Sequence, residues 1–349
     1  MKKIGSFKLL KINMLFTVEI MKNFNNFQSI YIRSKNMKKT FLKTLTAILL
    51  LFLMACTKGQ TKTLRVGEKN TMITVERFKG EEADVNSYLL SDANNIIVVD
   101  LLRNSAEAEK LADYIEASDK KLKSIFITHG HPDHYMGLGV FQRRFPDVPV
   151  QVASVEIRDD IIQFSQWMES VGWLEKEPHM KVKSKQNPKG FDYSGVINVL
   201  DEPYLDLSPE SNRILVNSDF LNTESGHMTT LTIPEQKIFL GFDLLYDKVH
   251  AWCGPSVGQP EILNWIQALD EITKTTSEGS WTFYAGHGGQ GDESLVKNMK
   301  DYLEKFLEVT AKAKSRKEAI DKMKELFPGF AQEDFLLVHS INFHVKDEK

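Results

Sequence analysis

Short apolar runs punctuated by turn residues organise the chain after residue 70. They predict strands at 72–78, 86–90, 96–100 and 122–127, because runs of four to eight mostly apolar residues bounded by polar and glycine-rich turns are typical of strands. Between the last two runs, apolar residues recur at spacings of three and four, which predicts an amphipathic helix over 106–117. A strand, a helix and a second strand in this order indicate a βαβ unit.

The rest of the chain continues this alternation. Strands are predicted at 150–153, 195–200, 213–217, 229–233, 237–242 and 281–285, with helices at 136–145, at 155–173 and from Pro260 onward. The last part is helical by spacing over 292–314, 317–327 and 333–344, with Pro328 and Gly329 separating the last two helices. We interpret this part as a helical cap, and His339 and His344 in it as surface or packing residues.

The first 55 residues have a different pattern. A basic segment at 37–43 precedes eleven uncharged apolar residues at 45–55, which is too short to span a bilayer but suits the core of a secretory signal. The end of this run, Leu53-Met54-Ala55-Cys56, resembles the lipobox of bacterial lipoproteins. The resemblance implies cleavage before Cys56, lipidation of its sulfur, and export to the bacterial cell envelope with a lipid anchor in a membrane. Translation is then expected to start at Met37, with 56–70 as a tether.

Removing residues 1–55 changes the charge of the protein. The whole chain has a formal charge of −3, but this segment holds ten basic residues and one acidic residue, so the remainder carries −12. Such a domain repels polyphosphate, and we therefore expect no nucleic-acid partner. Only Cys56 and Cys253 are present. If Cys56 is lipidated no disulfide can form, and Cys253 is expected to be a small buried side chain.

The candidate chemistry centres on the stretch Thr128-His-Gly-His-Pro-Asp-His134, directly after the apolar run 122–127. Gly130 and Pro132 stop any regular element, so we expect a strand that ends in a tight loop. Imidazole and carboxylate are ligands that zinc accepts, and a catalytic zinc takes three protein ligands. Four candidate ligands therefore predict two metals. The alternative is a solvated turn or a single structural zinc. Further candidate ligands later in the chain weigh against this alternative.

The pattern His-x-His-x-Asp-His after a strand resembles the signature of the metallo-β-lactamase superfamily. The resemblance implies an αββα four-layer sandwich of two mixed sheets, spanning 71–292 and capped by 293–349. It implies that one zinc is bound by His129, His131 and His227, that the other is bound by Asp133, His134 and His287, and that Asp243 bridges them. Asp100 would orient a zinc-bound imidazole. Iron or manganese could replace zinc. The bridging aspartate is typical of glyoxalase-like hydrolases and lactonases rather than of β-lactamases.

These assignments predict a dinuclear hydrolase in which a metal-bound hydroxide attacks a small ester, lactone, thioester or amide. Asp133 and His250 are the candidate catalytic residues, and Tyr246 and Trp252 are expected beside the substrate. For the aromatic rings of Tyr246, His250 and Trp252, the alternative is that they pack under a loop. A β-lactamase, a phosphodiester hydrolase and an iron redox enzyme are the other enzymatic interpretations. A lipoprotein that retains the fold for binding or as a scaffold is the non-enzymatic one.

Overall fold

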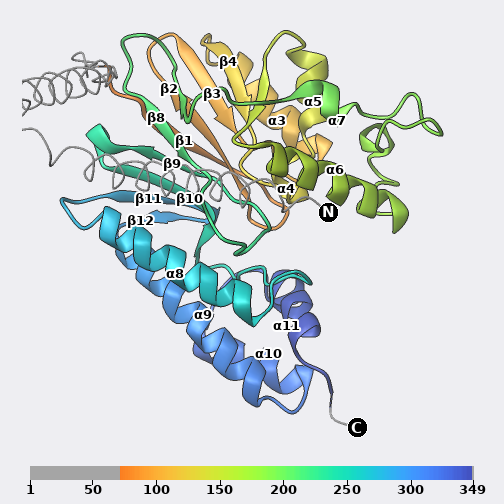
Figure 1. Cartoon of the computed structure of the whole chain (residues 1–349), viewed down its shortest axis with the longest axis vertical. Helices are drawn as coiled ribbons and strands as arrows, with labels where there is room; N and C mark the ends of the chain where they lie inside the picture. Colours follow the sequence, from red (N-terminus) through yellow and green to blue (C-terminus); the bar gives the residue numbers. More distant parts are fainter. Residues whose placement is uncertain (1–70, 348–349) are drawn as a thin grey trace, which may run out of the picture. The chain divides into compact units, whose positions relative to one another are not determined.

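The computed structural model describes residues 71–347, which lie in the second of the two units into which the chain divides, Glu68–Lys349. The leader, the lipidation site at Cys56 and the tether expected from the sequence lie outside the described residues. The described part contains two six-stranded sheets, ordered β1-β2-β3-β4-β5-β6 and β12-β11-β10-β9-β8-β7 (Figure 1). None of its helices is both long and apolar enough to cross a membrane.

The first sheet begins with two antiparallel pairings and continues with three parallel ones. Its strands are β1 (Thr74–Lys79), β2 (Asn86–Ser91), β3 (Asn95–Val99), β4 (Lys121–Phe126), β5 (Val150–Val152) and β6 (Ile197–Val199). After Asn95, β3 is apolar and both of its faces are buried. Ile96 and Val98 face the outer helices, whereas Ile97 and Val99 face the second sheet.

The helices of the first half cover the outer face of this sheet. They are α3 (Ser105–Glu116), α4 (Pro132–Tyr135), α5 (Leu138–Arg144), α6 (Val155–Ser170) and α7 (Tyr193–Val196), with a 3₁₀ turn η1 (Pro178–Met180). α3 begins after Asn104, whose side chain accepts a hydrogen bond from the backbone N–H of Glu107. Ser154 caps α6 in the same way through Ile157. Both caps satisfy backbone donors that a helix start leaves unpaired.

The second sheet is antiparallel except where β10 runs parallel to β11. Its strands are β7 (Tyr204–Leu205), β8 (Ile214–Asn217), β9 (Thr230–Ile233), β10 (Ile238–Asp247), β11 (Thr282–Gly288) and β12 (Gln290–Gly291). A 3₁₀ turn, η2 (Pro234–Gln236), joins β9 to β10. β10 continues well beyond the predicted 237–242 because its ladder with β11 is interrupted by register shifts near Phe242 and then resumes at Tyr246.

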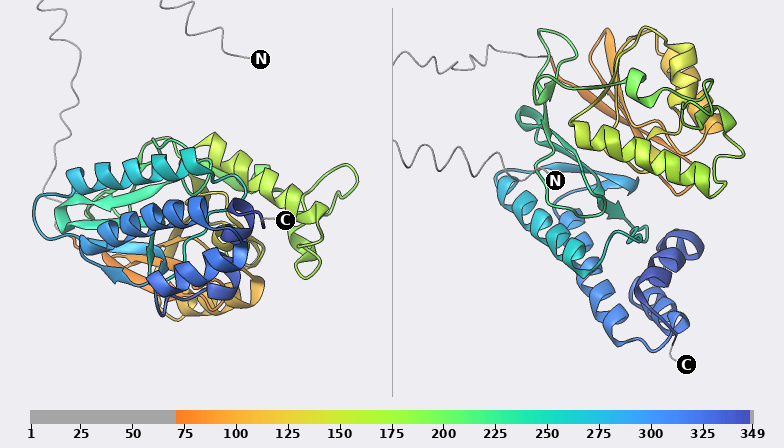
Figure 2. Two further views of the ribbon diagram at one scale, coloured as in Figure 1. Left: turned by 90° about the horizontal axis from the view of Figure 1, so that it is seen from below. Right: turned by 45° about the vertical axis from the view of Figure 1, so that its right-hand side comes forward.

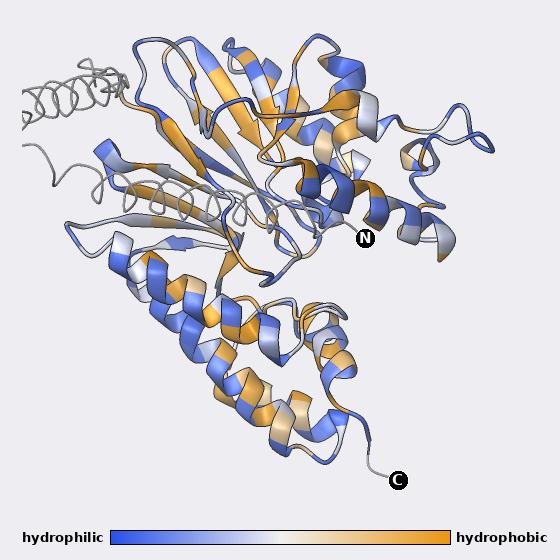
Figure 3. Ribbon diagram, in the orientation of Figure 1, coloured by the Kyte–Doolittle hydropathy of each residue, from blue (hydrophilic) through white to orange (hydrophobic). Residues whose placement is uncertain are grey.

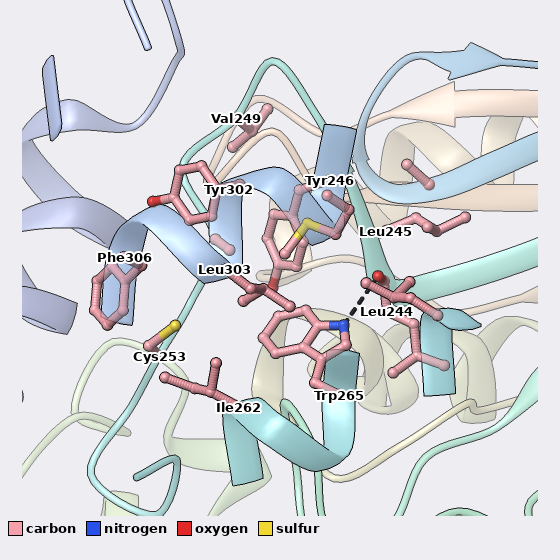
Figure 4. Close-up of a cluster of buried hydrophobic side chains, with 14 of the residues drawn as sticks. Leu244, Leu245, Tyr246, Val249, Cys253, Ile262, Trp265, Tyr302, Leu303 and Phe306 are labelled. Carbon is pink, nitrogen blue, oxygen red and sulfur yellow. Dashed lines mark hydrogen bonds between the residues drawn. The ribbon is translucent and has the colours of Figure 1, made fainter. Parts of the chain in front are cut away.

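Helices of the second half cover the outer face of the second sheet. They are α8 (Gln259–Thr275), α9 (Ser294–Lys312), α10 (Arg316–Leu326) and α11 (Val338–His344), preceded by the π-helix η3 (Glu333–Leu337). α8 and α9 pack side by side (Figure 2). Trp265 of α8 is fully buried against β10 and donates its indole N–H to the carbonyl oxygen of Leu244 at 3.0 Å (Figure 4).

Three apolar cores hold the layers together, as the inward orange faces of strands and helices show in Figure 3. One core joins the first sheet to α3, α5 and α6, a second fills the space between the sheets, and a third joins the second sheet to α8, α9, α10 and α11. Helices, sheet, sheet and helices are therefore stacked in that order, and the predicted αββα sandwich with a helical C-terminal region is confirmed.

Candidate metal centre

The loop that follows β4 carries four of the predicted ligands. β4 ends at Phe126, and Pro132 occupies the first turn of α4, where its missing N–H costs nothing. Gly130 lies so close to α6 that a Cβ there would be 2.7 Å from Cβ of Asp160. This close approach packs the loop against α6. His129 and His134 are fully buried, whereas His131 and Asp133 retain slight exposure.

Asp100, directly after β3, fixes the conformation of this loop through hydrogen bonds. Its backbone has φ +62°, a left-handed conformation that aspartate tolerates better than most residues. The buried carboxylate accepts hydrogen bonds from the backbone N–H and the hydroxyl of Thr128, both at 2.9 Å, and from Nδ1 of His134 at 2.7 Å. Because Nδ1 of His134 is engaged, its Nε2 faces the site. Asp100 therefore lies where an orienting carboxylate is expected.

Asp243 reaches the same site from the irregular part of β10. Phe242 has φ +47°, and the ladder with β11 shifts register on either side of it. Such an irregularity re-aims the neighbouring side chain. Oδ2 of Asp243 lies 3.3 Å from Nε2 of His134 and 3.1 Å from Nε2 of His287, and it accepts a 3.0 Å hydrogen bond from the hydroxyl of Tyr246.

His287 is positioned by contacts on both sides of its ring. Its Nδ1 donates to the carbonyl oxygen of Ala83 at 2.8 Å, which leaves Nε2 free to face Asp243. The ring stacks on Tyr246, with the two planes 2° apart and the centroids at 4.6 Å. Gly286, the preceding residue, has no room for a side chain, since a Cβ there would collide with Asp243 and lie 2.7 Å from the backbone of Phe242.

The structure gathers the candidate ligands into two groups. Within each group, the donor atoms all lie within 4.8 Å of one another. The first group is His129, His131, Glu224 and Asp243, and the second is Asp133, His134 and His287. Six of the seven ligands expected from the sequence are thus brought together. His227 is the exception, because its side chain is 42% exposed and its Nδ1 bonds instead to Asp160 of α6 at 2.7 Å.

Glu224 occupies the place expected for His227. Its carboxylate is fully buried, with Oε1 2.9 Å from Nδ1 of His131 and Oε2 3.6 Å from Nε2 of His129. Met228 is also buried and accepts a hydrogen bond from the hydroxyl of Ser225. Residues on both sides of His227 in this turn, Ser225 and Met228, are therefore buried in the core. The sequence signals were the inserted Met228 and an acidic residue three positions before the histidine.

Several buried atoms of the cluster have no hydrogen-bond partner among the described residues. They are Nε2 of His129, Nε2 of His134, Oε2 of Glu224 and Oδ1 of Asp243. An unpartnered buried polar atom is costly, and four within one cluster require a common partner. A pair of divalent cations would satisfy these atoms, since their types match the ligands of zinc, manganese and iron. The residues present therefore fit a metal centre.

The charges of the carboxylates and imidazoles in the cluster strongly affect one another's pKa. Burial alone would raise the pKa of Asp243, but His134 and His287 beside it hold that pKa well below its ordinary value. Burial likewise opposes protonation of His287, yet Asp243 raises its pKa to about 9. Burial raises the pKa of Glu224 to about 7, against the opposing effect of His131. The acidic and imidazole side chains of the cluster are thus coupled through their charges.

A pocket of about 530 Å³, counting the part open to solvent, leads to this cluster. Tyr246 and Trp252 line it, as expected. His250 does not line it, because its ring is buried between Tyr302 and Phe330 and its Nδ1 bonds to the hydroxyl of Tyr302 at 3.1 Å. The prediction that His250 borders the substrate is therefore wrong in the structure. Sequence reasoning missed several further lining residues, among them Arg103, Phe164, Trp173, Phe335 and His339.

Comparisons with known proteins agree with this fold. Residues 80–158 match the family model described as Metallo-beta-lactamase superfamily. Hydroxyacylglutathione hydrolase 1 of Vibrio vulnificus (strain YJ016) is 31% identical over 74 residues, which are 21% of this chain and 28% of that relative. The aligned segment thus spans little more than a quarter of the relative's length.

Similar solved structures are metallo-β-lactamases with low sequence identity. The DIM-1 metallo-β-lactamase exposed to ceftazidime is 16% identical, with 67% of this chain and 97% of that chain covered and a TM-score of 0.46. The metallo-β-lactamase of Pontibacter korlensis is 17% identical, with coverage of 66% and 94% and a TM-score of 0.45. The similarity to the metallo-β-lactamase superfamily model thus covers residues 80–158, the segment that contains the ligand loop.

Proposed function

We propose that the protein is a dinuclear metal-dependent hydrolase acting on a small ester, lactone, thioester or amide. The observation that carries the proposal is the pair of adjoining donor groups, seven side chains in all, at the inner end of a pocket. Two bound cations would lower the pKa of water to about 7 and so supply a hydroxide nucleophile at neutral pH without a serine or cysteine.

The chain's own residues have separable tasks in this proposal. Asp133, whose Oδ2 lies 3.5 Å from Nε2 of His287, is the most exposed carboxylate of the two donor groups and lines the pocket. Asp243 would hold a cation together with residues of both groups, since its Oδ2 lies 3.7 Å from Nε2 of His129 and 3.3 Å from Nε2 of His134. Tyr246, buried beside Asp243 and Glu224, has a pKa well above its ordinary value because of burial and these carboxylates, so it remains a hydrogen-bond donor.

The charge of the pocket favours a carbonyl substrate over a phosphodiester. Arg103 is the one lysine or arginine that lines it among the described residues, and its Nε lies 3.7 Å from Glu82. Recognition of phosphate usually needs clustered cations or backbone N–H groups. We retain a β-lactamase and a phosphodiester hydrolase as alternatives. Assays with β-lactam and phosphodiester substrates distinguish them from the proposed function.

A substrate panel with the full chain tests this function. The zinc-loaded protein is assayed on lactones, esters, thioesters, phosphodiesters and β-lactams, and its metal content is measured. We expect about two equivalents of metal and turnover of a carbonyl substrate that is lost in Asp133→Asn. A protein that purifies without metal and gains no activity from zinc or manganese would be a binding protein rather than an enzyme.

We also propose that the enzyme works at a membrane surface through a lipid on Cys56. The support is the Leu53-Met54-Ala55-Cys56 sequence after an uncharged apolar run, and two acyl signals are what stable anchoring requires. Detergent partitioning of the wild type and of Cys56→Ser tests this. The wild type should enter the detergent phase, and a Cys56→Ser protein that still does so would contradict the lipid anchor.

A further inference from the structure

The pocket above the candidate metal centre has two aromatic walls that come from distant parts of the chain. One wall consists of Phe164 of α6 and of Trp173, which follows that helix. The other consists of Trp252, in the loop after β10, and of Phe335 of the π-helix η3. The C-terminal cap thus supplies part of the substrate pocket as well as covering the second sheet.

Each wall is supported by a second aromatic ring behind it. Trp167 packs edge-on against Phe164, with centroids at 5.2 Å, and against Trp173 at 4.9 Å. On the opposite side, Phe343 of α11 packs edge-on against Trp252 at 6.1 Å. Backed rings hold their orientation without a ligand, so little side-chain entropy is lost when a substrate binds.

The outer parts of these walls are exposed to an extent that stability alone does not explain. Trp173 is 49% exposed and Phe335 is 37% exposed. Exposed apolar clusters of this kind usually mark a binding surface. The walls also continue directly to the candidate metal centre, because the ring of Phe164 packs edge-on against His131 at 5.7 Å.

We propose that these four aromatic side chains bind an extended apolar group of the substrate, a medium-length acyl chain or an aryl group attached to the carbonyl that reacts. This inference deepens the proposed function and rests on it. Arg103 is the only lysine or arginine on the lining among the described residues, so the pocket suits a substrate with few negative charges. A highly charged thioester substrate would find no matching set of cations there.

Binding to the metal-free full chain tests the pocket independently of catalysis. The probes are neutral primary amides from butanamide to decanamide, titrated by calorimetry. We expect Kd to fall by about fourfold per added methylene, the gain from burying one such group, and the heat capacity change to become more negative with length. A Kd that does not change with chain length would overturn the inference.

Variants identify which residues form the walls. Trp173→Ala and Phe335→Ala should each weaken decanamide binding by about tenfold and leave butanamide within twofold, because only the longer chain reaches the outer walls. Trp173→Phe should restore most of the loss. The control is Tyr114→Ala, an exposed aromatic residue of α3 outside this pocket, which should change neither. Equal effects of Tyr114→Ala and Trp173→Ala would contradict the proposal.

Two further measurements separate this inference from other outcomes. For hydrolysis of p-nitrophenyl esters from acetate to decanoate by the zinc-loaded chain, KM should fall as the acyl chain lengthens. If amide binding depends on chain length but no ester is hydrolysed, the proposed function is disproved, whereas the apolar binding site is not. Vesicles of neutral phospholipid test whether the exposed rings insert into lipid instead. Loss of vesicle binding in Trp173→Ala with unchanged decanamide binding would overturn the substrate assignment.

Discussion

Glu224 and His131 face each other at 2.9 Å, between Oε1 of the carboxylate and Nδ1 of the imidazole. This contact places a carboxylate where the motif predicts a histidine, and His227 bonds to Asp160 instead. The first group of donors consequently holds two imidazoles and two carboxylates. Carboxylate ligands suit manganese and iron as well as zinc, so the substitution bears on which metal the site prefers.

Glu224→Gln should therefore remove metal from the first group, whereas His227→Gln should not. A neutral amide is a poor ligand compared with a carboxylate, and we expect the affinity for one of the two metals to fall by at least about a hundredfold, more than removal of an orienting residue costs. Metal content and competition with a chelator measure this. Loss of one equivalent from His227→Gln, with Glu224→Gln unaffected, would restore the assignment expected from the motif.

Asp100→Asn should weaken metal binding through the orientation of His134. The carboxylate accepts three hydrogen bonds, and an amide can accept only some of them while presenting a donor to Nδ1 of His134. We expect a loss of about tenfold to a hundredfold in metal affinity. Asp119→Asn is the matched control, because Asp119 also has a left-handed backbone, with φ +56°, but is exposed. Equal affinity in the two variants would show that Asp100 does not act on the site.

Gly286→Ala should disrupt the site by steric overlap. A methyl group there would meet Asp243 and the backbone of Phe242, and neither can move without disturbing β10. We expect unfolding free energy to fall by about 1–3 kcal/mol together with loss of bound metal. Gly291→Ala on β12 is the control, since its methyl group would have only an ordinary 3.6 Å contact with Leu295. Normal metal content in Gly286→Ala would show that the strand can adjust.

The fold could be predicted from the sequence because its strands are short, mainly apolar runs bounded by turn residues, and the central strand β3 is apolar and buried on both faces after Asn95. The strands β3 and β4 were predicted to within one residue at each end. The two-residue strands β7 and β12 were missed, since two residues carry no periodicity. The length of β10 was missed as well, because a register shift with β11 is a property of the pair rather than of either segment.

The residues of the candidate site also comprise some that could be predicted from the sequence and some that could not. The positions that could be predicted are histidines and aspartates in or directly after apolar strands, where residue type and local context carry the information. Glu224 could not be predicted, because a glutamate in a polar loop is ordinarily solvated and only the packing of Met228 and Ser225 shows that it is buried. Of the aromatic walls only Trp252 was predicted, and the others were missed for a related reason, since α6 and η3 are about 170 positions apart along the chain.

His250 provides a prediction about stability rather than catalysis. Burial lowers its pKa from the ordinary 6.5 to about 4, because its ring is enclosed by Tyr302 and Phe330 and its Nε2 has no partner among the described residues. Glu333 raises this pKa and Lys324 lowers it, and neither effect outweighs burial. The unfolded chain thus binds a proton at this position at a higher pH than the folded chain does. Stability from this group is complete above pH 6.5 and is lost as the pH falls toward 4.

Chemical denaturation at pH 7 and pH 4.5 should reveal this contribution. Between these two values the wild type should lose on the order of 2 kcal/mol more unfolding free energy than His250→Gln, which has no proton to gain at this position. The comparison uses the change with pH within each protein, so a general destabilisation by the substitution does not affect it. His179→Gln, at a largely exposed histidine, should retain the wild-type dependence. If His250→Gln and the wild type show the same pH dependence, His250 is not held neutral by its burial in the C-terminal core.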